Sequence, residues 1–226
     1  MYTLILLSGG VGTRMNNTIP KQYMLLAGKP VIMHILERVN DIEEISEVII
    51  VCAEEYINSI KLMCEKYGIT KNTQFAIAGH TRQESVKNGL RKVRTNYVLL
   101  HEAARPFVKR EDFKRLIESP YKNITYGIKI PFTVLIGEEK IVGILDRKEL
   151  VNVQLPQKFE FQPFSDAHDK AYSEKKSFTE DASLLFYFYP EIPIKIMDGM
   201  EYDIKLTTRQ DLLQGEIIYQ ELFAKR

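Results

Sequence analysis

Residues 4–22, LILLSGGVGTRMNNTIPKQ, place an apolar strand directly before a glycine-rich turn. The unbroken apolar run at residues 4–7 is typical of a strand that is covered on both faces of a sheet. The turn after it contains Ser8, Gly9, Gly10 and Gly12. Glycines lack a Cβ, so this backbone can adopt positive φ and direct several N–H groups toward an anion.

Two fixed cations, Arg14 and Lys21, follow the turn, and no carboxylate lies between Gly9 and Lys21. We therefore expect the loop to bind a polyphosphate. The dinucleotide fingerprint GxGxxG fails because Met15 occupies its third glycine position, which argues against a nicotinamide dehydrogenase. The P-loop pattern GxxxxGK[ST] is also absent, which argues against an ATPase of that class.

Composition limits the partners and the compartment. The 226 residues include 31 Lys and Arg against 30 Asp and Glu, and a net charge of +1 predicts no general affinity for nucleic acid or for an anionic membrane. Cys52 and Cys64 have no zinc-ligand spacing and suit a reducing environment. The first apolar run is too short for a signal peptide or a span, so we expect a cytoplasmic protein.

Strands and helices alternate through the first half of the chain, which predicts an α/β fold. We expect strands at 4–7, 48–52, 75–78 and 97–100, and helices at 30–39, 54–67 and 81–93. Thr81 followed by Glu84 forms a capping box for the third helix. This order predicts a Rossmann-like, mostly parallel sheet with helices on both faces and ligands at the carboxyl ends of the strands.

We expect residues 1–226 to form a single domain. In its second half, strands and helices no longer alternate regularly. A strand at 124–130 precedes TVLIGEEKIVGILD (133–146), whose two apolar runs around a polar turn predict a β-hairpin. We expect it to project as an arm at about 132–150, and an exposed apolar hairpin favours a homodimer. Further helices are expected at 162–175, at 181–189 with Thr179 as cap, and at 210–223 with Thr208 as cap.

The string GGVGTRM, a polar spacer and PKQ together resemble the sugar-phosphate nucleotidyltransferases, whose signature is GGxGxRM followed by PK. PKQY (20–23) is similar to the branch of methylerythritol phosphate and ribitol phosphate cytidylyltransferases. The resemblance implies the nucleotide-diphospho-sugar transferase fold. It also implies a Mg²⁺-dependent reaction of CTP with a small polyol phosphate that releases pyrophosphate.

The resemblance assigns the nucleotide to the opening loop and to AGHTRQESVKNGL (78–90), where Gly79, Arg82 and Ser85 match the family. Arg14 and Lys21 match its catalytic pair, and Lys205 in DIKLTTRQDL matches its substrate-phosphate lysine. Apolar neighbours on both sides of Lys205 would leave it alone on one face of a strand.

A phosphate monoester has a second pKa of about 6, so it is mostly a dianion near pH 7 and needs no general base. The chemical difficulty is negative charge, which fixed cations and magnesium offset. His101 is accordingly interpreted as a strand-end histidine bonded to backbone. No metal ligand is identified.

Acceptor contacts implied by the resemblance are Glu102 and Arg105 in HEAARPF (101–107), Thr133 and Arg147 in the arm, and Thr179 in TEDASLL. Arg147 would reach the substrate of the other subunit. Three positions depart from the family: Glu102 stands for Asp, Phe132 for Asp, and Leu155 in VQLPQKF for Thr. A missing substrate-binding hydroxyl or a displaced carboxylate alters specificity.

Two acceptors therefore stay open. HEAARP, SVKNGL, EDASLL and IKLTT favour methylerythritol phosphate, whereas GGVGTRM and the three departures favour ribitol 5-phosphate or a related phosphate used in surface polysaccharide. A noncatalytic nucleotide-binding protein is a third possibility. Retention of Arg14, Lys21, Arg105 and Lys205 argues against it.

Overall fold

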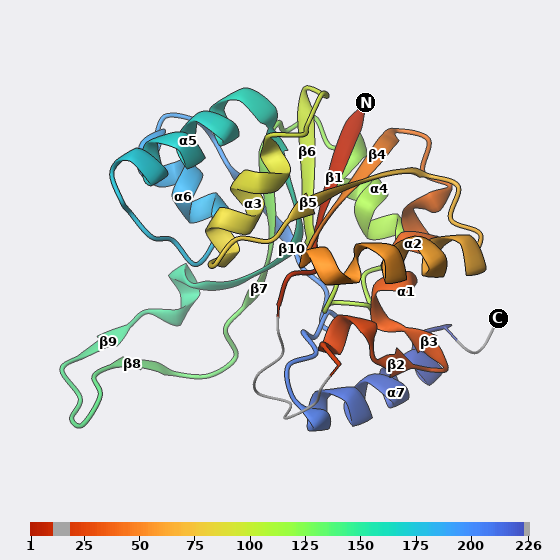
Figure 1. Cartoon of the computed structure of the whole chain (residues 1–226). Coiled ribbons are helices and arrows are strands. Elements are labelled where there is room, and N and C mark those ends of the chain that lie inside the picture. Colours follow the sequence, from red (N-terminus) through yellow and green to blue (C-terminus); the bar gives the residue numbers. More distant parts are fainter. Residues whose placement is uncertain (11–18, 224–226) are drawn as a thin grey trace.

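The computed structural model describes residues 1–10 and 19–223 and is built on a central sheet (Figure 1). Seven strands lie in the order β11-β7-β10-β6-β1-β4-β5. Their bounds are β1 Tyr2–Leu7, β4 Ile45–Cys52, β5 Asn72–Ile77, β6 Tyr97–Glu102, β7 Ile124–Lys129, β10 Val151–Glu160 and β11 Lys195–Asp198. Strands β6, β1, β4 and β5 are mutually parallel, and β10 runs antiparallel to both of its neighbours. The predicted mostly parallel α/β sheet is confirmed.

Helices cover both faces of this sheet, as predicted. They are α1 Val31–Asn40, α2 Ile57–Lys66, α3 Arg82–Leu90, α4 Arg110–Glu118, α5 Phe161–Ser173 and α6 Asp181–Phe188. The last helix, α7 Arg209–Phe223, packs beyond the carboxyl ends of the central strands (Figure 1). Single 3-10 turns are η2 Lys21–Tyr23, η3 Glu54–Tyr56 and η4 Arg147–Glu149. A small antiparallel pair, β2 Leu25–Leu26 and β3 Lys29–Pro30, precedes α1.

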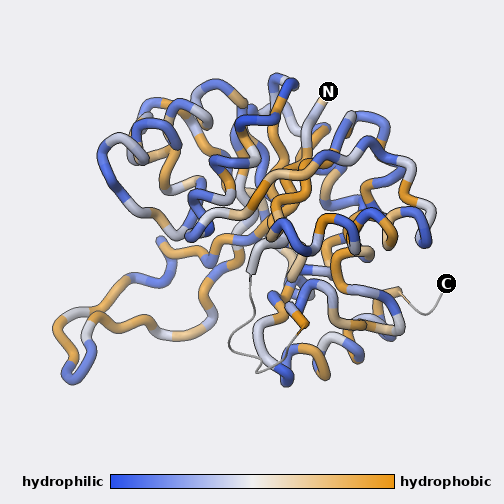
Figure 2. The backbone as a smooth tube through the Cα atoms, viewed as in Figure 1, coloured by the Kyte–Doolittle hydropathy of each residue, from blue (hydrophilic) through white to orange (hydrophobic). Residues whose placement is uncertain are grey.

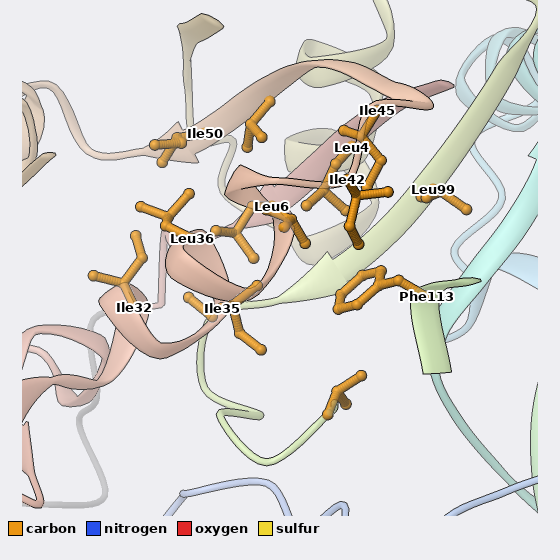
Figure 3. Packing of buried hydrophobic residues seen from close by; sticks show 14 of the residues in the cluster. Leu4, Leu6, Ile32, Ile35, Leu36, Ile42, Ile45, Ile50, Leu99 and Phe113 are labelled. Carbon is orange, nitrogen blue, oxygen red and sulfur yellow. The ribbon is translucent and has the colours of Figure 1, made fainter. Parts of the chain in front are cut away.

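The apolar run of β1 divides its side chains between two cores, because successive residues of a strand point to opposite faces. Leu4 and Leu6 pack with residues of α1, α2 and α4 (Figure 3). Ile5 and Leu7 pack on the other face with residues of α3, α5 and α6. Burial on both faces explains why the run shows no alternation of polar and apolar residues.

A third hydrophobic cluster packs α7 against the small pair of strands β2 and β3. Leu26, Val31, Phe107 and Leu206 are buried together, and Leu212 and Tyr219 of α7 pack against them. Figure 1 shows α7, β2 and β3 below the carboxyl ends of the central strands. The segment that carries Lys205 is therefore held at the ligand end of the sheet.

The arm is an antiparallel hairpin of β8 Val134–Ile136 and β9 Gly143–Leu145 that projects away from the sheet (Figure 1). Its tube is largely apolar in Figure 2. The most exposed of its large apolar side chains are Phe132 at 77% and Ile144 at 73%. The hairpin predicted from TVLIGEEKIVGILD is thus present, and most of its apolar surface is uncovered in a single chain.

Several elements were not predicted from the sequence: α4, β10, β11 and the short pair β2 and β3. Helix α4 carries Phe113, Leu116 and Ile117 at helical spacing, a pattern that indicates a helix. Strand β10 contains Pro156, which cannot donate to a ladder and interrupts the pattern of a central strand. The register between β10 and β7 shifts between Gln154 and Lys158, so the chain accommodates the proline as an irregularity.

The predicted helix caps are right in two cases and wrong in one. Thr81 accepts a hydrogen bond from Glu84 N, and Thr208 accepts one from Asp211 N. The cap of α6 is Glu180 rather than Thr179: its carboxylate accepts from Ala182 N and Ser183 N. A carboxylate satisfies two free N–H groups and complements the positive end of the helix, which one hydroxyl cannot do.

No helix in the described ranges is long and apolar enough to cross a membrane.

Candidate active site

A cavity of about 270 Å³ lies at the carboxyl ends of β1 and β6. Its lining comprises Leu7, Ser8, Gly9, Gly10, Lys21, Gln22, Gly79, His80, Thr81, Arg82, Ser85, Glu102, Ala104 and Lys205. Nine of these were singled out from the sequence: Ser8, Gly9, Gly10, Lys21, Gly79, Arg82, Ser85, Glu102 and Lys205. The predicted residues Gly12 and Arg14 lie outside the described residues. Segments that are nearly 200 residues apart in sequence thus meet at one site, at the end of the sheet where ligands were expected.

The start of the loop is held by two buried residues that sequence reasoning did not assign. Gln22 Nε2 donates to Ser8 O at 2.7 Å and to Gly10 O at 3.0 Å. The Ser8 hydroxyl donates to the Tyr23 hydroxyl, which donates back to Ser8 O. Burial raises the pKa of Tyr23 to about 12, so its phenol stays protonated as a donor. The one sequence signal for Gln22 and Tyr23 was their place in the PKQY motif.

Glycine is needed at two cavity positions because of close approach. A Cβ on Gly9 would lie 2.4 Å from Ala78 Cβ, and one on Gly79 would lie 2.3 Å from Glu84 Cβ. Gly9 does not use the positive φ that glycine allows, since the glycines with positive φ in the described ranges are Gly28, Gly68 and Gly137. The loop therefore requires glycine at position 9 for contact with the strand end at Ala78 rather than for an unusual dihedral angle.

The first turn of α3 opens onto the cavity. Ser85 Oγ donates to Thr81 O at 2.9 Å and accepts from Gly79 N at 3.0 Å, and Glu84 accepts from His80 N. These bonds fix the turn between β5 and α3. The N-terminus of a helix favours negative charge, so this wall suits an anionic ligand.

Glu102, the last residue of β6, is bridged by two cations from distant segments. Its Oε1 accepts from Arg82 Nε at 2.8 Å, and its Oε2 lies 2.6 Å from Lys205 Nζ. Burial alone would raise the pKa of Glu102, but Lys205 and Arg82 outweigh it and lower the pKa to about 2. The carboxylate is therefore ionised and orients both cations at the edge of the cavity. The extra methylene relative to Asp is accommodated by these partners.

Behind Arg82 lie two buried residues, Asp181 and His168. The Arg82 guanidinium pairs with Asp181 Oδ2, and His168 Nε2 lies 3.3 Å from Asp181 Oδ1. Burial opposes ionisation of Asp181, but Arg82 and then His168 bring its pKa below the ordinary value. Arg82 is thus clamped between two carboxylates. Its own pKa is raised by Asp181 and Glu102 against the effect of burial.

Arg105 is not among the residues that line the cavity, and the substrate contact that the resemblance implies for it stays a prediction. Its Nη1 donates to Asp203 O at 3.2 Å and to Asp203 Oδ2 at 3.1 Å, and its Nε lies 3.8 Å from Glu102 Oε2. Burial and the charge of Glu102 raise the pKa of Asp203 to about 7, although Arg105 opposes the rise. The contacts with Asp203 hold the Arg105 side chain behind Glu102.

Lys205 reaches the cavity, but from an irregular segment and not from the expected strand. Leu206 N donates to Ala104 O, which ties this segment to the loop after β6. Leu206 is buried in the α7 cluster, while the Lys205 side chain points to Glu102. The sequence analysis thus predicted correctly that Lys205 and Leu206 point in opposite directions, but it placed them wrongly in a strand.

Three predicted acceptor residues lie away from the cavity within one chain. Thr133 and Arg147 are exposed in the arm, where Arg147 Nη1 donates to Pro131 O at 2.7 Å and braces the arm's base. Thr179 is exposed before α6. The roles that the resemblance gave to these side chains stay predictions, and for Arg147 the role concerns a second copy of the chain.

His101 is a packed strand residue, as interpreted from the sequence. Its side chain is fully buried, and Nε2 is 3.0 Å from Arg105 O. Burial lowers its pKa to about 3, so the imidazole is neutral near pH 7. It has no path to a substrate in the cavity.

The cavity collects positive charge around one carboxylate. Lys21, Arg82 and Lys205 line it with Glu102 among the described residues. No group of three or more His, Cys, Asp or Glu side chains in the described ranges is placed to hold a metal ion. Such a site can bind and neutralise a polyphosphate through fixed cations and helix-end N–H groups.

Comparison with known proteins agrees with this geometry. The family model described as IspD, 2-C-methyl-D-erythritol 4-phosphate cytidylyltransferase, matches residues 2–221. Proteins of that name from Clostridium botulinum (strain 657 / Type Ba4) and Halalkalibacterium halodurans are each 32% identical to this chain. The alignments cover 97% of this chain and 98% and 97% of the relatives.

Solved structures give the same relationship. The 4-diphosphocytidyl-2C-methyl-D-erythritol synthase of Anaerococcus prevotii DSM 20548 superposes with a TM-score of 0.85 at 27% identity, covering 97% of this chain and 96% of that chain. The bifunctional IspDF of Campylobacter jejuni has a TM-score of 0.77 at 26% identity and covers 94% of this chain and 53% of that chain. With a matched family model, full-length relatives and a shared fold, the chain belongs to the 2-C-methyl-D-erythritol 4-phosphate cytidylyltransferase family.

Proposed function

We propose that this protein transfers a cytidylyl group from CTP to 2-C-methyl-D-erythritol 4-phosphate and releases pyrophosphate. The observation that carries the proposal is the cavity at the carboxyl ends of β1 and β6, which Lys21, Arg82 and Lys205 line together with Glu102. Relatives that match nearly the whole chain bear the name of this activity. The nucleotide would lie against the loop after β1 and the first turn of α3.

In the proposed reaction, an oxygen of the acceptor phosphate forms a bond to the α-phosphorus of CTP, and the bond to the bridging oxygen of the β-phosphate breaks. The electron pair leaves with pyrophosphate. The acceptor is mostly a dianion near pH 7, so no residue has to remove a proton. Lys21 and Lys205 would offset the repulsion between the two anions and the charge that develops in the transition state. Arg14 would act with Lys21, as the family resemblance implies.

Mg²⁺ is proposed as the cofactor. Protein sites for Mg²⁺ commonly use one or two carboxylates together with substrate phosphates and water, and Glu102 is the carboxylate that lines the cavity in the described ranges. Its Oε2 is ion-paired with Lys205 Nζ at 2.6 Å, so a metal here would be held mainly by the triphosphate and would share this carboxylate with the lysine. When bound, the ion supplies positive charge that polarises the phosphates.

Methylerythritol phosphate is preferred over ribitol 5-phosphate because the matching family and relatives carry its name. Two of the three positions that differ from the family, and that had favoured ribitol 5-phosphate, lie away from the cavity. Leu155 is buried in the apolar core beside α5 and α6, and Phe132 is exposed in the arm, so neither lines the cavity of its own chain. Glu102 is the departure that lies in the cavity.

A homodimer formed through the arm and a cytoplasmic location are proposed as well. The uncovered apolar side chains of the hairpin, Phe132 and Ile144 among them, need a partner surface. Cys52 and Cys64 are buried free thiols, as suits a reducing compartment.

The activity is tested by pyrophosphate release from CTP and Mg²⁺, with methylerythritol phosphate and ribitol 5-phosphate offered in parallel. We expect turnover with the first, and loss of 10² to 10³-fold in kcat, as an order of magnitude, in Lys21→Ala, with no change in Lys61→Ala on α2. Turnover with ribitol 5-phosphate alone would replace the acceptor. Unchanged turnover in Lys21→Ala would refute the mechanism.

The dimer is tested by light scattering on the wild type and on Ile144→Asp, with Leu62→Asp on exposed α2 as control. We expect a dimer for the wild type and the control and a monomer for Ile144→Asp. A monomeric wild type would contradict the proposal.

A further inference from the structure

A second cavity, of about 260 Å³, lies between α3 and α5 on the face of the sheet opposite α1. Figure 1 shows these two helices side by side. Three basic side chains line it: Lys87, Arg91 and Arg94. The remaining wall is partly apolar, with Leu90, Val93 and Phe161. We call it the basic cavity, and it is separate from the cavity that holds Glu102.

The charges of the basic cavity are only partly matched. Lys87 Nζ lies 2.8 Å from Asp169 Oδ1. Arg91 Nη1 donates to Asn88 Oδ1 at 3.2 Å, and Arg94 Nη1 donates to Val93 O at 3.0 Å. In the described part of the chain, neither guanidinium has a carboxylate within 4.0 Å. Two arginines without a counter-charge are therefore available to an anion.

His168 forms the inner end of the basic cavity. Its side chain is 1% exposed, and neither ring nitrogen makes a hydrogen bond with a described residue. Nε2 faces Asp181 at 3.3 Å, whereas Nδ1 has no polar neighbour within bonding distance in the described ranges. A buried nitrogen without a partner is costly. His168 thus places an unsatisfied, buried side chain in the lining of the basic cavity.

We propose that the basic cavity binds a small organic phosphate that carries a short apolar group, and that its binding changes the affinity of the neighbouring site for CTP. Guanidinium groups match phosphate oxygens, and Leu90, Val93 and Phe161 suit an apolar substituent. Helix α3 lines both cavities, with Arg82 and Ser85 at one end and Lys87 and Leu90 at the other. His168 also touches Asp181, which clamps Arg82. The effect on CTP affinity rests on the proposed function, whereas binding of the organic phosphate in the basic cavity does not.

Binding is tested by calorimetry with phenyl phosphate on protein saturated with CTP and Mg²⁺, so that the first cavity is filled. The test variant is Arg91→Gln/Arg94→Gln, and the charge-matched control is Lys92→Gln/Lys114→Gln, whose residues do not line the basic cavity. We expect one phenyl phosphate per chain, affinity at least about tenfold weaker in the test variant and unchanged in the control, and weaker binding of inorganic phosphate. Equal affinity in both double variants would overturn the site.

A second readout follows the imidazole of His168 by NMR, with its resonances assigned from His168→Gln. We expect phenyl phosphate to shift them in the wild type and not in Arg91→Gln/Arg94→Gln, and to change the Kd for CTP only in the wild type and the control. An unchanged Kd for CTP in the wild type would overturn the coupling. A protein that binds phenyl phosphate this way but releases no pyrophosphate would refute the proposed function and retain the site.

Discussion

Glu102 Oε2 lies 2.6 Å from Lys205 Nζ, across 103 residues of sequence, at the edge of the cavity where β6 ends. The same carboxylate accepts from Arg82 Nε at 2.8 Å. One buried anion therefore sets the positions of two cations that belong to different layers of the molecule.

Replacing Glu102 by Gln removes the charge and keeps the shape. Arg82 and Lys205 then lose a counter-charge, so we expect the free energy of unfolding to fall by about 1–2 kcal/mol, a value reduced for the partial exposure of Lys205. CTP binding measured in EDTA should become tighter, because the cavity loses a negative charge. Chemical denaturation and calorimetry check both effects, with Glu118→Gln on α4 as control. Weaker CTP binding in EDTA would contradict this account of Glu102.

Truncating Gln22 to Ala removes both donors to Ser8 O and Gly10 O. The loop then loses its anchor, and we expect the KM for CTP to rise about tenfold, which corresponds to about 1.4 kcal/mol for two buried hydrogen bonds. Steady-state kinetics measures the change against Gln162→Ala, which removes an exposed glutamine of α5. If both variants keep the wild-type KM, the hydrogen bonds of Gln22 do not position the loop.

The contact between Gly9 and Ala78 predicts a reciprocal pair of variants. Gly9→Ala places a Cβ 2.4 Å from Ala78 Cβ, which overpacks the junction of β1 and β5 and should cost about 1–3 kcal/mol. Ala78→Gly removes the opposing methyl group. We therefore expect Gly9→Ala/Ala78→Gly to recover most of the stability and the CTP affinity, as followed by thermal unfolding and calorimetry. A double variant no better than Gly9→Ala would mean that position 9 needs glycine for another reason.

Asp203 predicts a pH dependence of stability. Its pKa in the folded protein is raised to about 7 from an ordinary value of 3.8, mainly by burial. Between these values the folded state holds a proton that the unfolded state has lost, so this group makes stability fall as pH rises from about 4 to 7.

Asp203→Asn should therefore gain stability relative to the wild type across that window, by at least about 1 kcal/mol at pH 7. Denaturation at several pH values measures the difference, with Asp198→Asn as an exposed control. A difference that does not change between pH 4 and 7 would show that Asp203 is ionised throughout.

The sequence by itself determined the alternation of elements and the chemical set of the loop, because both depend on neighbouring residues. The unbroken run at 4–7 indicated a strand buried on two faces, and the structure gives it one core on each side. Thr81 and Thr208 marked helix starts, since a cap bonds to residues three positions along the chain. The resemblance carried by GGVGTRM and PKQ led to the family.

Only the tertiary structure decided how the charges pair. Arg105 is drawn to Asp203, and Lys205 reaches Glu102 from an irregular segment, because strand order and the packing of α7 bring these distant residues together. Strand β10 pairs in spite of Pro156, since its neighbours on both sides supply a ladder that local propensity does not predict. Long-range pairing has no signal in adjacent residues, so the site's electrostatics emerged only with the fold.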